Sequence, residues 1–250
     1  MEAAVAEPEI LLSKGRYRAR LAAGADDVAA AQALRTLCFR TAAADSDPFD
    51  SRCTHVLVEE KASGALVCCF RLLLLEGGAV LEQSYSAQFY DLSALQNFAG
   101  RMAELGRFCT HPEWQDPDIL RIAWGALTGL VDGQGVQMLF GCSSFAGTSA
   151  EPYKDAFELL RQRYLAPAQW RPAERAPEVV RFSVESPRTA DAKKALQAMP
   201  PLLRAYLAMG GWVSGHAVVD RQMNTLHVFT GLETGAIPDA RKRLLRAVAG

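Results

Sequence analysis

Charged side chains stand inside segments that are otherwise apolar, where a charge is costly unless it is paired. Glu104 and Arg107 lie in the run Met102–Thr110, and Arg71 lies in the run Ala65–Leu75. A carboxylate in such surroundings commonly forms an ion pair with a neighbouring arginine, and it is also a group that can remove a proton during catalysis. Residue type alone leaves both uses open for Glu104.

The histidines and cysteines show no pattern of metal ligands. The 4 histidines are dispersed along the chain, and the 6 cysteines include no Cys-x-x-Cys pair. Several cysteines lie inside apolar runs, which suits buried reduced thiols better than disulfides or zinc ligands. We therefore expect no metal site.

Composition points to one compact cytoplasmic protein. The formal net charge of the 250 residues is −1, which gives no overall electrostatic reason to bind nucleic acid. Residues Met1–Ile10 lack the basic and then apolar profile of a secretory signal. The longest apolar stretches are interrupted by Arg71 and Arg204 and fall short of the roughly 20 residues that a membrane span needs.

Local patterns predict the elements that would position these charges. The apolar stripe of Ala29–Arg40 predicts an amphipathic helix, and His55–Glu60 with Ala65–Leu75 predicts a hairpin. The further elements expected up to Tyr164 are a short helix at Leu92–Phe98, a strand at Met102–Thr110, a helix at Asp118–Val131 capped by Asp116, a strand at Val136–Cys142 and a helix capped by Ser149.

Prolines divide the last third of the chain. Four of them between Ala166 and Pro187 exclude a continuous helix there, although Val179–Val184 could form a strand. The elements expected beyond are helices at Ala190–Met199 and from Pro200 to Gly210, then strands at Val213–Val219 and Thr225–Leu232.

Three motifs together resemble the acyltransferase branch of the Gcn5-related N-acetyltransferase (GNAT) superfamily. They are Asp47-Pro-Phe-Asp50, the strand Leu66–Leu74 with Phe70-Arg71-Leu72-Leu73, and Glu104-Leu-Gly-Arg107-Phe108. This branch includes acyl-homoserine-lactone synthases and the ornithine N-acyltransferases of ornithine-lipid synthesis. The chain resembles the latter more closely, because the likeness continues through Leu165-Ala-Pro167, Pro200-Pro-Leu-Leu-Arg204-Ala-Tyr206-Leu, Val219-Asp220 and Asn224-Thr225.

The resemblance covers about Arg16 to Leu232 and implies an α/β (α+β) fold. Its centre would be a GNAT-like mixed, mostly antiparallel sheet flanked by helices, with a C-terminal helical and hairpin extension. We expect an acyltransferase core at residues 16–165 and an extension at residues 166–250 that packs on the core as a single compact unit.

One departure from the superfamily concerns the acyl donor. Members that use coenzyme A carry a glycine-rich loop that binds pyrophosphate at the start of the helix after the central strand. Here the segment Gln115–Arg121 has no glycine and two aspartates, which would repel a pyrophosphate. This favours the acyl-phosphopantetheine of acyl carrier protein as co-substrate, with no tightly bound cofactor. A phosphate site made of side chains would, however, also lack a glycine-rich loop.

Amide formation from a thioester needs a base for the attacking amine and stabilisation of the carbonyl oxygen. The resemblance implies Glu104 as the general base, and it places the backbone of Phe108, Cys109 and Thr110 beside the thioester carbonyl. Tyr153 or Tyr164 could protonate the leaving thiolate, but a half-buried tyrosine that only packs its ring is the more common case.

The family resemblance also implies a charged cluster around the amine acceptor, made of Asp47, Asp50, Arg71, Arg107 and, from the first helix, Arg35. The cluster could instead only lock the first helix and its loop to the sheet, which for Arg35 is the more common arrangement. Ser143 lies in the segment Val136–Phe145 that could line a slot for the acyl chain.

Acyl carrier proteins are acidic, so Arg121 and Lys154, with Arg161 and Arg163, are candidates for docking one, although ordinary solvated helix faces carry such residues too. The segment Leu196–Trp212 could make peripheral contact with the inner membrane face, but packing on its own domain is the commoner case.

The leading interpretation is transfer of a 3-hydroxyacyl group from acyl carrier protein to the α-amine of ornithine. One alternative is lactone synthesis from S-adenosylmethionine. It is disfavoured because the loop Thr41–Asp50 lacks the tryptophan that is typical of lactone synthases and because the C-terminal tail is extra. Another is a protein without catalytic activity that binds acyl carriers or a membrane.

Overall fold

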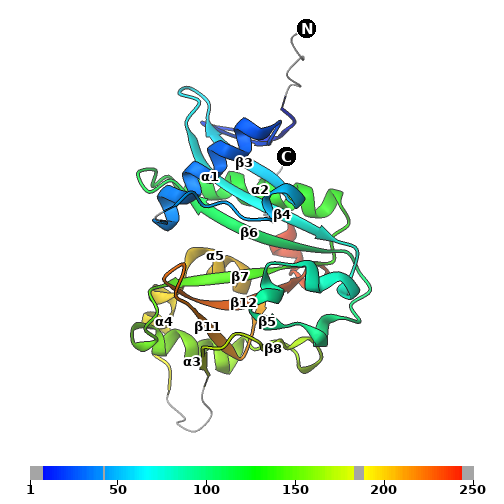
Figure 1. Ribbon diagram of the computed structural model, residues 1–250, viewed down its shortest axis with the longest axis vertical. Coiled ribbons are helices and arrows are strands. Elements are labelled where there is room, and N and C mark those ends of the chain that lie inside the picture. Colours follow the sequence, from blue (N-terminus) through cyan, green and yellow to red (C-terminus); the bar gives the residue numbers. More distant parts are fainter. Residues whose placement is uncertain (1–7, 42, 183–188, 244–250) are drawn as a thin grey trace. The chain divides into compact units, whose positions relative to one another are not determined.

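The computed structural model describes residues 8–41, 43–182 and 189–243, drawn in colour in Figure 1. These residues form two compact units. The first comprises residues 8–74, 105–136 and 239–243, and the second comprises residues 75–104 and 137–238. The strand β6 (Met102–Thr110) passes from the second unit into the first after Glu104. One strand therefore supplies Glu104 to one unit and Arg107 to the other.

The sheet of the first unit is built from the strands β1 (Ile10–Lys14), β2 (Tyr17–Leu21), β3 (Thr54–Glu60), β4 (Leu66–Leu75) and the end of β6, in that order. The pairs from β1 to β4 are antiparallel, which confirms the predicted hairpin. The β1–β2 hairpin was not predicted. Its turn contains Gly15 at a φ of +56°, a conformation that suits glycine.

The helices of this unit are α1 (Ala25–Phe39) and α2 (Pro117–Gly133). On β4, Cys69 packs against Ala31 of α1, whereas the next residue, Phe70, stacks on Phe108, whose ring meets Trp124 of α2. Successive side chains of a strand point to opposite faces. The two helices therefore cover opposite faces of these strands.

The strands of the second unit are β7 (Met138–Ala146), β12 (Thr225–Glu233), β11 (His216–Asp220), β9 (Val179–Arg181) and β10 (Trp212–Val213). They pair antiparallel in the order β7-β12-β11-β9, and β10 also pairs with β12. The start of β6 pairs parallel with β7 up to Glu104 opposite Phe140. A small second sheet joins β5 (Tyr90–Asp91) to β8 (Ala173–Glu174).

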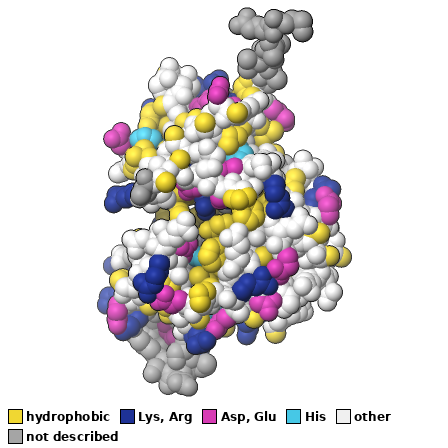
Figure 2. Space-filling view, in the orientation of Figure 1, with side chains coloured by type: hydrophobic (Ala, Val, Ile, Leu, Met, Phe, Trp, Pro, Cys, Tyr) yellow, Lys and Arg dark blue, Asp and Glu magenta, His cyan; other side chains and the backbone are white. Residues whose placement is uncertain are grey.

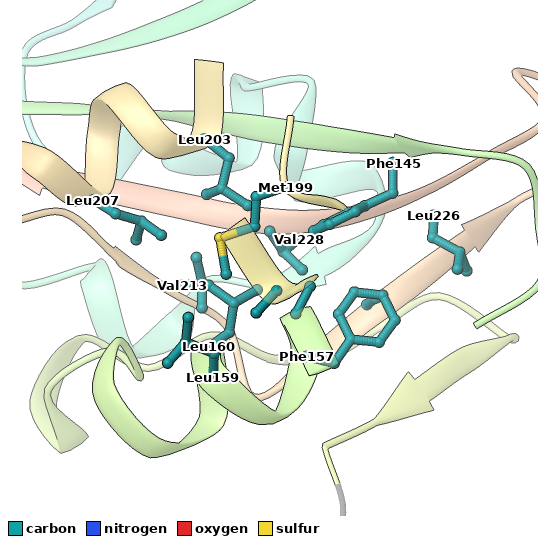
Figure 3. Close-up of a cluster of buried hydrophobic side chains, with 13 residues drawn as sticks. Phe145, Phe157, Leu159, Leu160, Met199, Leu203, Leu207, Val213, Leu226 and Val228 are labelled. Carbon is teal, nitrogen blue, oxygen red and sulfur yellow. The ribbon is translucent and has the colours of Figure 1, made fainter. Parts of the chain in front are cut away.

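The helices of the second unit are α3 (Lys154–Arg163), α4 (Ala192–Ala198) and α5 (Pro201–Ala208). Figure 3 shows side chains from these helices, such as Leu160 and Leu203, gathered with Val213 and Val228 of the strands in one buried hydrophobic cluster. The helices α4 and α5 and the strands β10, β11 and β12 thus share a core with β7 and α3. The predicted boundary at residue 166 stays a prediction.

The mixed, mostly antiparallel sheet flanked by helices agrees with the expected fold class, but several boundaries differ. The helix expected at Leu92–Phe98 is only a 3₁₀ turn at Ser93–Leu95. Ser149 does not cap α3. Its hydroxyl accepts from the Glu151 amide at 3.4 Å, and Glu151 is the first residue of a 3₁₀ turn, Glu151–Tyr153, that precedes the helix. The strand expected at Val213–Val219 is broken into β10 and β11. The strand expected at Val179–Val184 is described as β9 up to Arg181, and its last two predicted residues, Ser183 and Val184, lie outside the described residues.

Within the described part of the chain, no helix combines the length and the apolar character needed to cross a membrane.

Candidate active site

An ion-pair network occupies the first unit at the junction of α1, the loop after it, β4 and β6. Its members are three arginines and three aspartates: Arg35, Arg71, Arg107, Asp45, Asp47 and Asp50. Five of the six were predicted from the sequence. Asp45 was missed, although it lies in the same acidic loop as Asp47 and Asp50.

The inner half of the network is centred on Arg35. Its guanidinium donates to Asp50 Oδ1 at 2.6 Å, to Asp45 Oδ1 at 2.6 Å and to the Asp45 carbonyl at 2.7 Å. The side chains of Arg35, Asp45 and Asp50 are only 1%, 3% and 8% exposed. Such a buried and bidentate arrangement fixes the loop to α1. It supports the structural interpretation of Arg35.

The outer half of the network joins Asp47 to two arginines. Arg71 donates to both carboxylate oxygens of Asp47 at 2.7 Å and also to Asp50. Arg107 donates to Asp47 Oδ2 at 3.1 Å and to Asp45 Oδ1 at 3.0 Å. The side chains of Asp47 and Arg107 are the most exposed of the network, at 16% and 14%.

The backbone of Arg107 is in the left-handed region, with a φ of +52° in the middle of β6. Residues other than glycine adopt this conformation rarely, and it is found preferentially at functional sites. The local sequence, with Gly106 rather than Arg107 as the obvious candidate for such a conformation, gave no sign of it. The ion pairs to Asp45 and Asp47 hold the strained residue in place.

The arginines also keep Asp47 and Asp50 ionised. Burial alone would raise the pKa of Asp50, but hydrogen bonds from Arg35, Gln32 and Arg71 and the charge of Arg35 outweigh it and hold that pKa well below its usual range. The pKa of Asp47 is lowered in the same way by Arg71 and Arg107. Asp47 and Asp50 are therefore fixed negative charges at neutral pH.

The difference in stability between the wild type and Asp50→Asn should shrink as the pH falls below about 4, near the pKa of an unperturbed aspartate. Because the folded state lowers this pKa, ionised Asp50 stabilises the fold fully above the unfolded-state value, and the contribution is lost as the pH falls toward the folded-state value. Urea denaturation at several pH values measures it. A difference that stays constant down to about pH 2.5 would contradict the assignment. Exposed Asp118→Asn is the control, with little effect expected at any pH.

Glu104 is the last residue of β6 that pairs with β7, and its carboxylate is buried in the second unit, with the residue 5% exposed. Its Oε1 accepts from the Ser86 amide at 2.7 Å and the Ser86 hydroxyl at 2.5 Å, and its Oε2 accepts from the Tyr85 amide at 2.8 Å. Donors of this kind favour the ionised form of a carboxylate. Sequence reasoning missed Tyr85 and Ser86, which lie in a segment without periodic pattern.

The other predicted site residues of the second unit use their hydroxyls within the fold. Tyr153 donates to the Ala146 carbonyl at 2.7 Å, and its ring packs beside Phe145. It lies in the turn before α3 rather than in the helix. Ser143 on β7 is buried and accepts from the Thr230 hydroxyl at 3.0 Å. Their proposed roles in proton transfer and acyl binding stay predictions.

The end of β6 carries the predicted thioester-proximal residues. Phe108 is stacked on Phe70, Cys109 is buried with its Sγ 3.6 Å from Cys69 Sγ, and the Thr110 carbonyl accepts from the Cys38 thiol. All 6 cysteines are free, three of them buried, in agreement with the expected reduced thiols. A role for this segment beside the thioester stays a prediction.

The start of α2 is capped by the protein itself. Asp116 Oδ1 accepts from the Asp118 amide at 2.9 Å, and its Oδ2 accepts from the Tyr17 hydroxyl at 2.9 Å. These hydrogen bonds, with the first the largest cause, lower the pKa of Asp116 and keep it ionised. A negative charge therefore lies at the start of α2, the end of a helix that would otherwise attract an anion.

The two main docking candidates are exposed but paired. Arg121 contacts Asp118 at 2.6 Å and Lys154 contacts Glu151 at 2.6 Å, each with a side chain more than half exposed. On the face drawn in Figure 2, basic and acidic side chains are interspersed rather than gathered by sign. Docking of an acidic partner at Arg121 or Lys154 stays a prediction.

Fold and sequence comparison define the class of protein. The family Acetyltransferase (GNAT) domain matches residues 33–125, which contain both the network and Glu104. Two solved structures share the fold: FeeM, an N-acyl amino acid synthase from uncultured soil microbes (TM-score 0.51, 10% identity, 89% of this chain and 93% of that one), and the GphF GNAT-like decarboxylase in complex with isobutyryl-CoA (TM-score 0.51, 16% identity, 87% and 99%). The chain therefore has a GNAT domain and a GNAT-type fold.

Similarity to curated relatives narrows the class to a family. An L-ornithine Nα-acyltransferase of Rhodobacter capsulatus is 32% identical over 90% of this chain and 93% of the relative. An enzyme of the same name from Rhizobium meliloti is 30% identical over 94% of this chain and 86% of the relative. The chain therefore belongs to the family of L-ornithine Nα-acyltransferases.

Proposed function

We propose that this protein transfers a 3-hydroxyacyl group from acyl carrier protein to the α-amine of ornithine and so makes a lyso-ornithine lipid. The observation that carries the proposal is the similarity to L-ornithine Nα-acyltransferases over nearly the whole chain. In this reaction the thioester C–S bond breaks and an amide C–N bond forms. The amine loses a proton, and the carrier thiolate gains one.

Glu104 is the proposed base that accepts the amine proton. Its carboxylate is buried, and three N–H or O–H donors favour its ionised form, which is the form that a base requires. The competing interpretation is that Glu104 only anchors Tyr85 and Ser86. Replacing its carboxylate distinguishes the two.

The exposed edge of the ion-pair network is the proposed binding place for ornithine. Ornithine brings two amines and one carboxylate, and Asp47 and Arg107 offer one group of each complementary charge.

Acyl carrier protein is the proposed donor because α2 begins at an ionised carboxylate. A coenzyme A donor would bring its pyrophosphate to a helix start whose amide is already occupied. The single phosphate of the carrier's pantetheine arm carries less negative charge than a pyrophosphate, so the carboxylate at the helix start repels it less. The proposed location is the cytoplasm, with peripheral contact at the inner membrane face for release of the product.

The test combines purified protein with 3-hydroxyacyl carrier protein and, separately, ornithine, lysine, glutamine, glycine or S-adenosylmethionine, and detects products by mass. Acylated ornithine is expected. A lactone from S-adenosylmethionine would favour the second enzyme interpretation, and no acyl amide with any acceptor would overturn the proposal.

Charge reversal tests the proposed docking of the carrier. Arg121→Glu and Lys154→Glu should each raise KM for acyl carrier protein by about tenfold, since long-range attraction to an acidic partner is lost, and leave KM for neutral acyl-pantetheine unchanged. Arg181→Glu, on exposed β9, is the matched control. Equal KM values for the carrier in all variants would remove these residues from the docking surface.

A further inference from the structure

The carboxylate of Glu104 is held by a short turn that sequence reasoning did not identify. Ser86 supplies two of the three hydrogen-bond donors to Glu104. Its amide and its hydroxyl both donate to Glu104 Oε1, at 2.7 Å and 2.5 Å. Ser86 itself is fully buried, and its hydroxyl also lies 3.5 Å from the thiol of Cys142 on β7. Since the Ser86 hydroxyl donates to Glu104, the thiol is the donor in this second contact.

We propose that Ser86 is a positioning residue that orients the Glu104 carboxylate and keeps it ionised for proton removal. The inference rests on the proposed role of Glu104 as base. Two donors on one carboxylate oxygen fix the plane and the rotamer of the side chain, and hydrogen bonds to an ionised carboxylate stabilise that form. Glu104 is thereby kept ready to accept a proton.

The turn does not depend on the Ser86 hydroxyl for its own structure. The Ala87 amide donates to the Ser84 hydroxyl at 3.2 Å, which closes the turn from the other side. Farther along, the buried hydroxyl of Tyr90 donates to the His227 carbonyl on β12 at 2.8 Å. A variant without the Ser86 hydroxyl should therefore fold.

Ser84 and Ser86 form a matched pair for an experiment. Both are serines of one turn and both are buried, at 1% and 0% exposed. The Ser86 hydroxyl binds Glu104, whereas the Ser84 hydroxyl binds the backbone of the turn. A role in shaping the turn would be shared by both residues, but a role in orienting the base belongs to Ser86 alone.

Other titratable groups near Glu104 are Cys142 on β7 and Tyr206 on α5. Burial, followed by the charges of Glu104 and Cys142, raises the pKa of Tyr206 well above its usual value. Tyr206 therefore stays neutral over the pH range of an assay. Titration of Tyr206 would then not contribute to a shift in the pH profile of kcat that a change at Ser86 causes.

The experiment measures kcat and KM for ornithine against pH in the full chain for the wild type, Ser86→Ala, Ser86→Thr, Ser86→Cys and Ser84→Ala. Ser86→Ala should lower kcat by about 10- to 100-fold, because a base that is no longer held in one orientation can cost on the order of 100-fold in rate, with KM little changed. The acid limb of its kcat profile should move to higher pH because the ionised form of Glu104 loses a donor.

The other variants make the result specific. Ser86→Thr keeps a hydroxyl and should restore the profile, and Ser86→Cys, with a weaker donor, should fall between the serine and alanine forms. Ser84→Ala should keep the wild-type profile. An unshifted profile in Ser86→Ala, or an equal shift in Ser84→Ala, would overturn the inference. Full activity of Glu104→Gln would instead overturn the proposed base, so the two failures are distinguishable.

Discussion

Glu104→Gln is expected to lower kcat for ornithine acylation by about 100- to 10,000-fold, the range that a positioned general base contributes. Glutamine has nearly the size and shape of glutamate but cannot take up the amine proton at neutral pH. KM for ornithine should change little, because the acceptor is proposed to bind at the edge formed by Asp47 and Arg107. Steady-state kinetics with product detection by mass measures both constants.

The matched control is Glu76→Gln, which alters a carboxylate of the same unit whose side chain is 77% exposed. It should leave kcat unchanged. Thermal unfolding of Glu104→Gln shows whether the hydrogen bonds to Tyr85 and Ser86 survive the change. A well-folded Glu104→Gln protein with activity within a few-fold of the wild type would restrict Glu104 to anchoring that turn.

Arg35→Ala should produce the second large effect, a loss of about 3–5 kcal/mol in the free energy of unfolding. The change leaves the buried carboxylates of Asp45 and Asp50 without the guanidinium that donates to both. At 2–4 °C per kcal/mol for a chain of this size, the melting temperature should fall by about 10 °C. Calorimetry and urea denaturation give the two quantities.

Arg181→Ala serves as the reference for this comparison, because it breaks an ion pair to Glu174 whose arginine side chain is 74% exposed. Exposed pairs contribute about 1 kcal/mol or less. If Arg35→Ala unfolds at nearly the temperature of Arg181→Ala, then Arg35 is not the structural centre of the network.

Local signals in the sequence were sufficient where one element carries its own pattern. The hairpin of β3 and β4, the full extent of β6 and the capping of α2 by Asp116 were all predicted, because alternation, apolar runs and a proline at the first helical position are read within a few residues. The charged motifs gave five of the six members of the network.

The missed features depend on contacts between distant segments. Asp45 meets Arg107, 62 residues away, and Ser86 meets Glu104, 18 residues away, and no spacing rule links such pairs. The left-handed backbone of Arg107 was equally hidden, since tertiary ion pairs rather than residue type stabilise it. The helix expected at Leu92–Phe98 is one 3₁₀ turn, because the amides of Leu95, Gln96 and Phe98 donate to carbonyls three residues earlier rather than four.

The self-capped start of α2 bears on where the lipid's acyl chain comes from. Growing fatty acids are carried on acyl carrier protein, whereas fatty acids that are being broken down or taken up travel as coenzyme A thioesters. With Asp116 fixed at the helix start, the pyrophosphate of coenzyme A would be repelled more strongly than the single phosphate of the carrier's pantetheine arm. With acyl carrier protein as the proposed donor, production of the lipid would follow the rate of fatty-acid synthesis, and fatty acids taken up from outside the cell would contribute little to it.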